Sequence, residues 1–271
     1  MVEAAVKTPR APRGQNGLSS YGKDMVENGC CRLEKIYGQN RLGLLTLTYP
    51  SLPEDYLLLL IADHSEIVRQ FSQQLDREIT RKSPKSKGHY IGVTEIQAGR
   101  MDRTGIPCPH LHIIYPSHGG GSIWDWWITA DRIREIWHSI LSARLARYLP
   151  PDQLPEIDVR ASVDCQKLKK SPAKYLCKYL SKGSCIKKIK ESKYSDYLPS
   201  AWWHCGRTLA RDIKNHIIKA PVTLLTAIRE GIDLVGRGLC EYLYPVERDE
   251  KVFGWVGKLT KLGSKFFRNS S

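Results

Sequence analysis

The run Pro109-His110-Leu111-His112 places two histidines at alternate positions. Because successive side chains of a strand point to opposite faces, His110 and His112 would share a face and form a pair of ligands for one divalent ion. Two histidines leave such an ion short of ligands, and hard cations favour carboxylate or carbonyl oxygens. We expect Glu95, on an adjoining strand, as the third ligand, with Gln97 as its substitute because it lies two residues on and on the same face.

Two tyrosines and two lysines lie close together further along the chain, in Tyr175-Leu176-Cys177-Lys178-Tyr179-Leu180-Ser181-Lys182. On a helix Tyr175 and Tyr179 are one turn apart. Lys178 and Lys182 follow on or near the same face, so two nucleophiles and two cations could converge on one phosphate. A free tyrosine has a pKa of about 10, so it needs nearby positive charge or a metal ion to react at neutral pH. The two motifs together predict a metal-assisted tyrosine nuclease.

Each motif alone also has an ordinary structural explanation. A His-x-His pair on a strand is often structural, two tyrosines four residues apart on a helix often form a packed aromatic face, and Glu95 could serve only in a salt bridge. The joint prediction depends on both motifs occurring in one basic chain, each on the kind of element that its chemistry needs.

Composition and charge favour a globular protein with a polyanionic partner. The chain has 271 residues, 41% of them hydrophobic, which is enough for one large domain or for one domain with a smaller appendage. Lys and Arg number 42 against 28 Asp and Glu, a formal net charge of +14. Such a charge suits nucleic acid, because phosphate contacts release condensed counterions.

The cysteines argue against a disulfide scaffold and against a zinc ribbon, because no two of them form a CxxC pair. An alternative of a different class is a non-catalytic nucleic-acid-binding protein in which Cys108, His110 and His112 hold a structural zinc ion. That site needs a fourth ligand, and only His118 and Cys165 are available at a distance. The eight cysteines are Cys30, Cys31, Cys108, Cys165, Cys177, Cys185, Cys205 and Cys240.

The ends of the chain and its apolar runs indicate no membrane role. Residues 1–23 are rich in Lys, Arg, Pro, Gly and Ser and lack the apolar core of a secretory signal, so we expect a flexible basic tail over residues 1–29. The longest apolar run, Tyr56 to Ala62, is far shorter than the roughly 20 residues that a membrane span needs. The irregular cysteine spacing, with no CxxC pair, fits a reducing cytoplasm best.

The hydrophobic patterns predict an α+β fold with a central antiparallel sheet of about five strands and flanking helices. The expected order is strand, helix, β-hairpin, helix, strand, helix, and the hairpin carries the histidines after a turn at 102–105. The expected strands are 42–49, 90–97, the histidine strand and 156–164, and the expected helices are 65–81, 130–148 and the tyrosine segment.

A change in composition divides the chain after the tyrosine motif. We expect a nuclease domain over residues 30–185 and a mostly helical C-terminal extension over residues 186–271 that could bind DNA, with helices at 208–218 and 222–235. The run Lys187 to Lys193 fits a solvated linker or a phosphate-tracking segment. Trp202 and Trp203 fit core packing, and beside basic residues such rings also suit stacking on unpaired bases.

The motifs resemble those of the HUH endonuclease superfamily, and specifically of rolling-circle replication initiators of small prokaryotic plasmids and single-stranded DNA phages. Leu45-Thr46-Leu47-Thr48 is similar to the first motif, a core strand with little catalytic content. Pro109 to His112 is similar to the metal-binding second motif, and Tyr175 to Lys182 to the nucleophile motif. The resemblance covers roughly residues 40 to 185.

The resemblance implies that Tyr179 is the initiating nucleophile and Tyr175 the second or terminating one, assisted by Lys178 and Lys182, with Mg²⁺ or Mn²⁺ as the cofactor. Many plasmid initiators have a glutamate where this chain has Tyr175, so the resemblance favours a second transesterification over hydrolytic termination. The double-tyrosine form is similar to phage gene A proteins.

The resemblance further implies a protein that nicks one DNA strand at a replication origin, forms a 5′-phosphotyrosine bond and later rejoins the strand. The expected substrate is a single-stranded or extruded hairpin origin, in the cytoplasm of a prokaryotic host. No GxxxxGK[ST] phosphate loop occurs in the sequence, so a host helicase is the expected unwinding partner. A transposase or a relaxase of the same superfamily remains the alternative.

Overall fold

The computed structural model describes residues 18–118, 126–168, 171–173, 175–176, 184–216, 240–248 and 251–259. The helix expected at 222–235 and the side chains of Lys178, Tyr179 and Lys182 lie outside these residues. The chain divides into two compact units, Met1–Ala210 and Arg211–Ser271. The predicted boundary near residue 185 therefore lies inside the first unit.

A five-stranded sheet in the order β4-β1-β3-β2-β5 forms the centre of the first unit, and every pairing in it is antiparallel. The predicted α+β class and the number of strands are confirmed. The histidine strand occupies the middle of the sheet. The strands are β1 (Leu42–Thr48), β2 (Ile91–Ile96), β3 (Pro109–Pro116), β4 (Val163–Lys167) and β5 (Trp203–Cys205).

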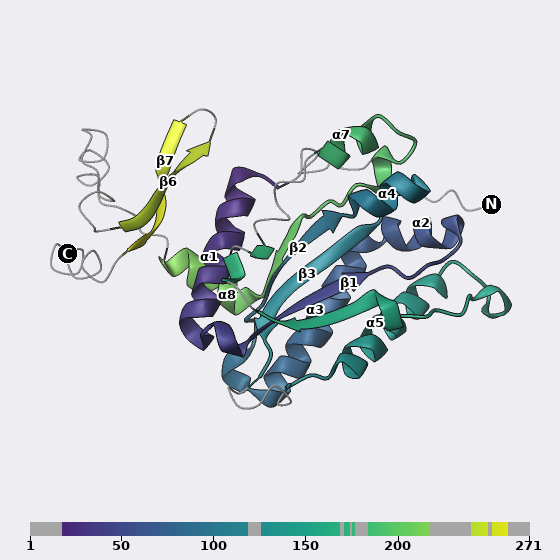
Figure 1. The fold of residues 1–271 in the computed structure, drawn as a ribbon, viewed down its shortest axis with the longest axis horizontal. Helices are drawn as coiled ribbons and strands as arrows, with labels where there is room; N and C mark the ends of the chain where they lie inside the picture. Colours follow the sequence, from purple (N-terminus) through teal and green to yellow (C-terminus); the bar gives the residue numbers. More distant parts are fainter. Residues whose placement is uncertain are drawn as a thin grey trace, which may run out of the picture. The chain divides into compact units, whose positions relative to one another are not determined.

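The two long amphipathic helices that the sequence predicts in its first 150 residues are present, and Ser20–Tyr37, Glu54–Ala62 and Ala98–Thr104 are helices that it does not predict. In Figure 1, α3 and α5 lie next to each other against the sheet. The α-helices are α1 (Ser20–Tyr37), α2 (Glu54–Ala62), α3 (His64–Lys82), α4 (Ala98–Thr104), α5 (Ala130–Leu145), α7 (Ser184–Lys190) and α8 (Arg207–His216). Short 3-10 turns lie at Gln39–Arg41, Pro84–Ser86, Pro151–Gln153, Arg160–Ser162 and Ser195–Tyr197.

One face of the sheet packs against α2, α3 and α5 and forms the larger hydrophobic core. From the sheet this core takes alternate residues of β1, β3 and β4, and from the helices it takes the residues at helical spacing. Burial of these side chains is the main favourable contribution to folding. Core residues that are less than 2% exposed include Leu45, Leu47, Leu111, Ile113, Ile67, Phe71, Leu75 and Trp137.

The other face of the sheet packs against α1, whose buried side chains Met25, Val26, Cys30 and Leu33 recur at helical spacing. The helix begins at Ser20, after Ser19 accepts a hydrogen bond from the backbone of Gly22 in an N-cap. The prediction of a flexible tail up to residue 29 was therefore wrong for residues 20–29. The prediction followed the basic composition of residues 1–23 and overlooked the apolar residues of α1 that begin at Met25.

Two further elements differ from the sequence prediction. The expected strand at 156–164 is wrong, because Arg160–Ser162 is a 3-10 turn and pairing with β1 begins only at Val163. Ile157 and Val159 alternate because both are buried against the core, although they precede the strand. The expected turn between β2 and β3 is replaced by α4, which ends at Gly105 in a left-handed conformation (φ 75°).

A close approach of two glycines holds the edge strand β5 in place. Gly88 precedes β2 with a φ of 69°, and a Cβ built on Gly206 would lie 2.2 Å from the carbonyl oxygen of Gly88. The Gly206 amide donates to Tyr90 at 3.0 Å, and the Leu209 amide donates to Gly88 at 3.1 Å. A side chain at position 206 would therefore separate the start of α8 from the loop before β2.

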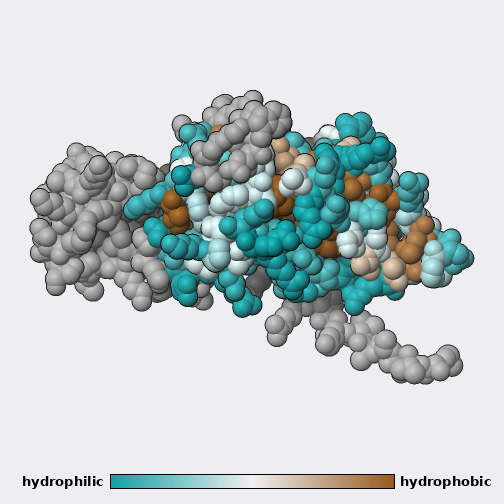
Figure 2. Space-filling view, turned by 90° about the horizontal axis from the view of Figure 1, so that it is seen from below, coloured by the Kyte–Doolittle hydropathy of each residue, from teal (hydrophilic) through white to brown (hydrophobic). Residues whose placement is uncertain are grey.

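In the second unit, β6 (Cys240–Arg248) and β7 (Lys251–Leu259) pair as an antiparallel hairpin. The predicted mostly helical extension did not include this hairpin. No described helix is both long and apolar enough to cross a lipid bilayer. The face of the molecule drawn in Figure 2 is mostly hydrophilic, with small hydrophobic patches among the polar residues.

Candidate functional site

The histidine motif lies on β3, between β1 and β2. His112 pairs with Thr46 on β1 and with Val93 on β2, and His110 pairs with Thr48 and Glu95 in the same way. Because side chains on paired strands point to the same face, the two histidines share the face that packs against α1. The strand pairing thus brings Glu95, predicted as the third ligand, opposite His110.

His112 is held between a carboxylate and a hydroxyl. Its Nε2 lies 3.2 Å from Oε2 of Glu95, and its Nδ1 lies 3.0 Å from Oγ1 of Thr46. His112 is 4% exposed and Glu95 is 7% exposed. With the carboxylate ionised, Nε2 carries the proton and Nδ1 accepts from the Thr46 hydroxyl, so two hydrogen bonds fix the ring orientation.

The geometry of the Glu95–His112 pair is suitable for a divalent ion. Adjacent ligands of an octahedral Mg²⁺ lie about 3 Å apart, since each stands at about 2.1 Å from the ion. The 3.2 Å between Nε2 and Oε2 is close to this spacing. A metal ion at Nε2 would replace its proton, and Thr46 would then accept a hydrogen bond from Nδ1, which is the usual way in which an outer residue orients a histidine ligand.

His110 lies beside this pair, with its ring centroid 6.1 Å from that of His112 and its plane tilted by 50°. Over the residues that the structure describes, no three His, Cys, Asp or Glu side chains gather closely enough to hold a metal ion. His112 and Glu95 are in contact, so a three-ligand set requires the His110 side chain to turn toward them. Gln97, the predicted substitute, lies beyond the end of β2 and precedes α4.

The tyrosine segment begins on the same side of the sheet. Ser171 donates a hydrogen bond to Glu34 of α1 at 3.2 Å, and the amide of Tyr175 donates to the carbonyl of Ser171 at 3.1 Å. Tyr175 is helical and half-buried, and Leu176 after it is fully buried. Ser171, four residues before Tyr175, therefore contacts α1, the helix that also covers the histidine face. The role of Tyr179 stays a prediction.

The zinc alternative has no geometric support. Cys108 belongs to the hydrophobic core on the face opposite His110 and His112, and burial raises the pKa of its thiol to about 11. A zinc ligand must be a thiolate, which this environment disfavours. Cys165, a possible fourth ligand, also packs against that core and pairs with Leu45.

A second group of buried polar side chains lies on the α3 side of the sheet. Nδ1 of His64 lies 2.9 Å from the Tyr49 hydroxyl, and its Nε2 lies 3.1 Å from Oγ1 of Thr94. Thr94 in turn lies 3.2 Å from Nε2 of His204 on β5. Burial lowers the pKa of His64 to about 3 and that of His204 to about 4, so both rings are neutral at pH 7. This network connects α3, β2 and β5.

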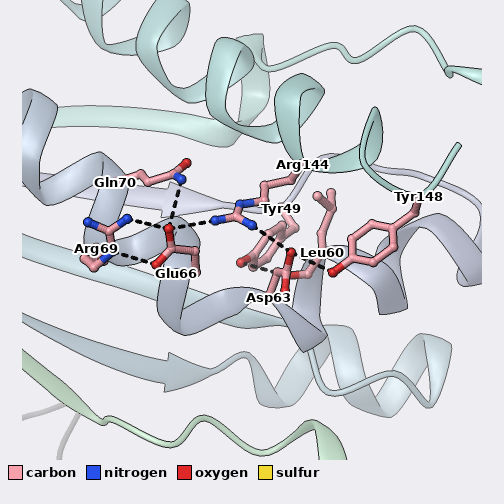
Figure 3. Close-up of polar contacts among 8 residues, drawn as sticks. All are labelled: Tyr49, Leu60, Asp63, Glu66, Arg69, Gln70, Arg144 and Tyr148. Atoms are coloured by element: carbon pink, nitrogen blue, oxygen red, sulfur yellow. Dashed lines mark hydrogen bonds and ion pairs between the residues drawn. The ribbon is translucent and has the colours of Figure 1, made fainter. Parts of the chain in front are cut away.

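A charged cluster near the end of β1 joins α5 to the start of α3 (Figure 3). Arg144 is 4% exposed and lies 3.2 Å from Oδ2 of Asp63 and 2.8 Å from Oε1 of Glu66. The Tyr148 hydroxyl donates to Asp63 at 2.9 Å. Hydrogen bonds from Arg69 are the main reason why the pKa of Glu66 falls to about 2. The cluster neutralises its own charges, so we assign it to helix packing.

The comparisons with known proteins give no relative from which a function could be transferred. No family model, no curated protein and no solved structure matches the chain significantly.

Sequence analysis missed the contact between Thr46 and His112. Thr46 was expected only as part of a core strand, although Thr46 and Thr48 put two polar side chains on one face of an otherwise apolar strand. That alternation was the available signal. The partner of the hydroxyl was not predictable, because it depends on the register between β1 and β3.

Proposed function

We propose that the protein is a rolling-circle replication initiator of the HUH type, which nicks one DNA strand at an origin and later rejoins it. The observation that carries the proposal is the contact of His112 on the central strand β3 with Glu95 on the neighbouring strand β2. An imidazole and a carboxylate at ligand spacing suit a divalent ion, and the tyrosine segment starts on the same side.

His110, His112 and Glu95 would hold the ion, and Thr46 would orient His112. When bound, Mg²⁺ or Mn²⁺ supplies a Lewis acid that polarises the scissile phosphate. Lys178 and Lys182 would add positive charge where the phosphate sits, which favours the phenolate over the phenol.

The Tyr179 phenolate would then attack the phosphorus. A bond forms between the tyrosine oxygen and phosphorus, the bond from phosphorus to the 3′-oxygen breaks, and the released 3′-oxygen takes a proton. The 5′ end stays on the protein as a phosphotyrosine ester, so the energy of the phosphodiester is kept. Attack by a 3′-hydroxyl on that ester reverses the step and rejoins the strand.

Tyr175 would act as the second nucleophile. A second tyrosine one helical turn away can accept a newly made strand by the same transesterification, while the first still carries the old one. The net charge of +14 favours a polyanion such as DNA, and the proposed substrate is a single-stranded or hairpin origin. A host helicase would supply the strand separation.

The test is a covalent-adduct assay. Wild-type, Tyr179→Phe, Tyr175→Phe and double-variant proteins are incubated with labelled single-stranded oligonucleotides that tile the replicon encoding the chain, with Mn²⁺ or with EDTA, and resolved on denaturing gels. We expect a Mn²⁺-dependent adduct that the double variant lacks, and the single variants will show which tyrosine reacts first. An adduct that persists in the double variant, or no adduct with any oligonucleotide, would refute the proposal.

A further inference from the structure

An aromatic pair with one exposed ring lies where α1 meets the edge strand of the sheet. Tyr21, the second residue of α1, is 49% exposed, and Trp203, the first residue of β5, is half-buried. Their ring centroids are 6.4 Å apart with an interplanar angle of 71°. Gly22 fits closely beside them, since a Cβ at this position would lie 3.2 Å from Cδ1 of Trp203. The two elements therefore bring the rings side by side.

Strand register places this pair on the same face as the histidines. Trp203 pairs with Val93 on β2, and Val93 pairs with His112 on β3. Paired residues point to one face, so the side chains of Trp203 and His112 share the α1 side of the sheet. The two positions are two strand spacings apart, which is about 10 Å. Neighbouring nucleotides of one DNA strand could span this distance.

We infer that Tyr21 and Trp203 form a stacking platform for an unpaired base close to the phosphate that is cut. This inference rests on the proposed function for the identity of the polymer, single-stranded DNA. Aromatic rings in a basic protein bind unpaired bases by stacking, and they do so with little dependence on sequence because every base has a π-face. A duplex keeps its bases stacked inside, so the platform distinguishes single strands from duplex.

A comparison with Tyr148 supports this role. Tyr148 is 50% exposed, but its hydroxyl donates to Asp63 in the cluster that packs α5. The exposure of Tyr21 instead accompanies a ring contact with Trp203, at the edge of the face that carries the candidate site. If the two rings only packed α1 on β5, their buried sides would suffice. The protein would then show no preference for single-stranded over duplex DNA that depends on these rings.

The experiment measures binding in EDTA, so that it does not depend on cleavage. Fluorescence anisotropy of a labelled oligothymidine and of a labelled duplex is recorded at fixed salt for wild-type protein and for Tyr21→Leu, Trp203→Leu and Tyr21→Phe. Leucine keeps apolar bulk and removes the ring, whereas phenylalanine keeps the ring. Tyr148→Leu is the matched control, because it removes an equally exposed tyrosine from the opposite side of the sheet. Thermal melts report whether each variant is folded.

We expect each of Tyr21→Leu and Trp203→Leu to weaken binding to the single strand about tenfold. Binding to duplex should stay within about twofold, and Tyr21→Phe and Tyr148→Leu should bind like wild type. Equal single-strand affinity in Tyr21→Leu and wild type would overturn the inference, and so would equal loss of single-strand and duplex binding. Tyr21 is half-exposed, so its variant remains informative if Trp203→Leu fails to fold.

The two proposals can fail separately. If no tyrosine adduct forms but Tyr21→Leu still loses single-strand affinity in EDTA, the platform stands and the nuclease mechanism falls. If adducts form and Tyr21→Leu binds like wild type, the nuclease proposal stands and the two rings only join α1 to β5.

Discussion

The two faces of the central sheet each bury histidines, but in opposite electrical environments. Neighbouring residues of β2 serve the two faces: Thr94 contacts His64 and His204 on the α3 side, and Glu95 contacts His112 on the α1 side. The partners of the first network are hydroxyls and imidazoles, and burial keeps its histidines neutral. The partner of His112 is a carboxylate.

This difference separates a structural network from a candidate site. A buried neutral imidazole between hydroxyls satisfies hydrogen bonds and has no charge with which to attract a cation. A buried carboxylate in contact with an imidazole carries a negative charge that would attract a metal ion in place of the imidazole proton. Of the neighbouring β2 residues Thr94 and Glu95, only Glu95 supplies a negative charge, which is why we propose the metal site on the α1 face.

The largest expected effect is the loss of adduct formation in His112→Gln. The amide keeps a donor toward Glu95 but is a poor replacement for an imidazole ligand, so we expect no Mn²⁺-dependent adduct on a denaturing gel. The matched variant His64→Gln, on the other face, should lower the free energy of unfolding and leave the adduct yield per folded molecule unchanged. Equal adduct yields in the two variants would remove the distinction between the faces.

Mild acid should weaken the α3-side network. His64 and His204 titrate near pH 6.5 when unfolded but near 3 and 4 when folded, so below pH 6.5 the unfolded chain binds protons first. The stabilisation is present above pH 6.5 and is lost as the pH falls toward those folded values. As the pH falls from about 7.5 to about 5, protonation of each histidine in the unfolded chain should lower the unfolding free energy by about 2 kcal/mol.

Urea denaturation at the two pH values measures this loss, and His204→Gln is the informative variant. It removes one of the two titrations, so its unfolding free energy should fall by about 2 kcal/mol less than that of wild type over the same pH range. The same pH dependence in variant and wild type would assign the acid sensitivity to other groups.

Arg144→Leu tests whether the charged cluster is structural. The substitution leaves Asp63 and Glu66 without a buried partner, but both carboxylates are partly exposed, so we expect a loss of about 2 kcal/mol in unfolding free energy. Arg134→Leu removes a more exposed ion pair with Asp131 on the same helix and should cost less than about 0.5 kcal/mol. A reduced adduct yield in folded Arg144→Leu would contradict the assignment to packing.

The smallest expected effect concerns Thr46. Thr46→Val removes the hydroxyl that orients His112, and we expect Mn²⁺ affinity, measured by calorimetry, to fall about tenfold. Thr46→Ser should restore it. Thr94→Val makes the same change on the opposite face, and it should lower stability without changing Mn²⁺ affinity. If Thr94→Val weakens Mn²⁺ as much as Thr46→Val does, the hydroxyl of Thr46 has no special role.

The sequence predicts the parts of the fold in which local pattern and tertiary environment agree. Continuous apolar runs gave β1, β2 and β3, and helical periodicity gave α3 and α5, because each of these elements buries a large, regular set of side chains. The edge strand β5 has only three residues and is defined by its pairing with β2. No local signal could distinguish it from a loop.

The candidate site was predictable in its residue types and not in its contacts. Alternation on one strand placed His110 and His112 on a shared face, and the hairpin suggested Glu95. Which histidine contacts the carboxylate depends on register and on side-chain direction, which a single sequence does not specify. Tyr21 and Trp203 are far apart in the chain, so only the folded structure brings them together.

The contact between Gly88 and Gly206 has a consequence for genetics. In a random screen for loss of single-strand binding, position 206 should be recovered together with Tyr21 and Trp203, although a glycine has no side chain with which to touch DNA. Position 206 is three residues from Trp203, and any side chain there collides with the Gly88 backbone. Such alleles would show lost binding without a changed contact residue, and a compensating change would be sought in the loop before β2.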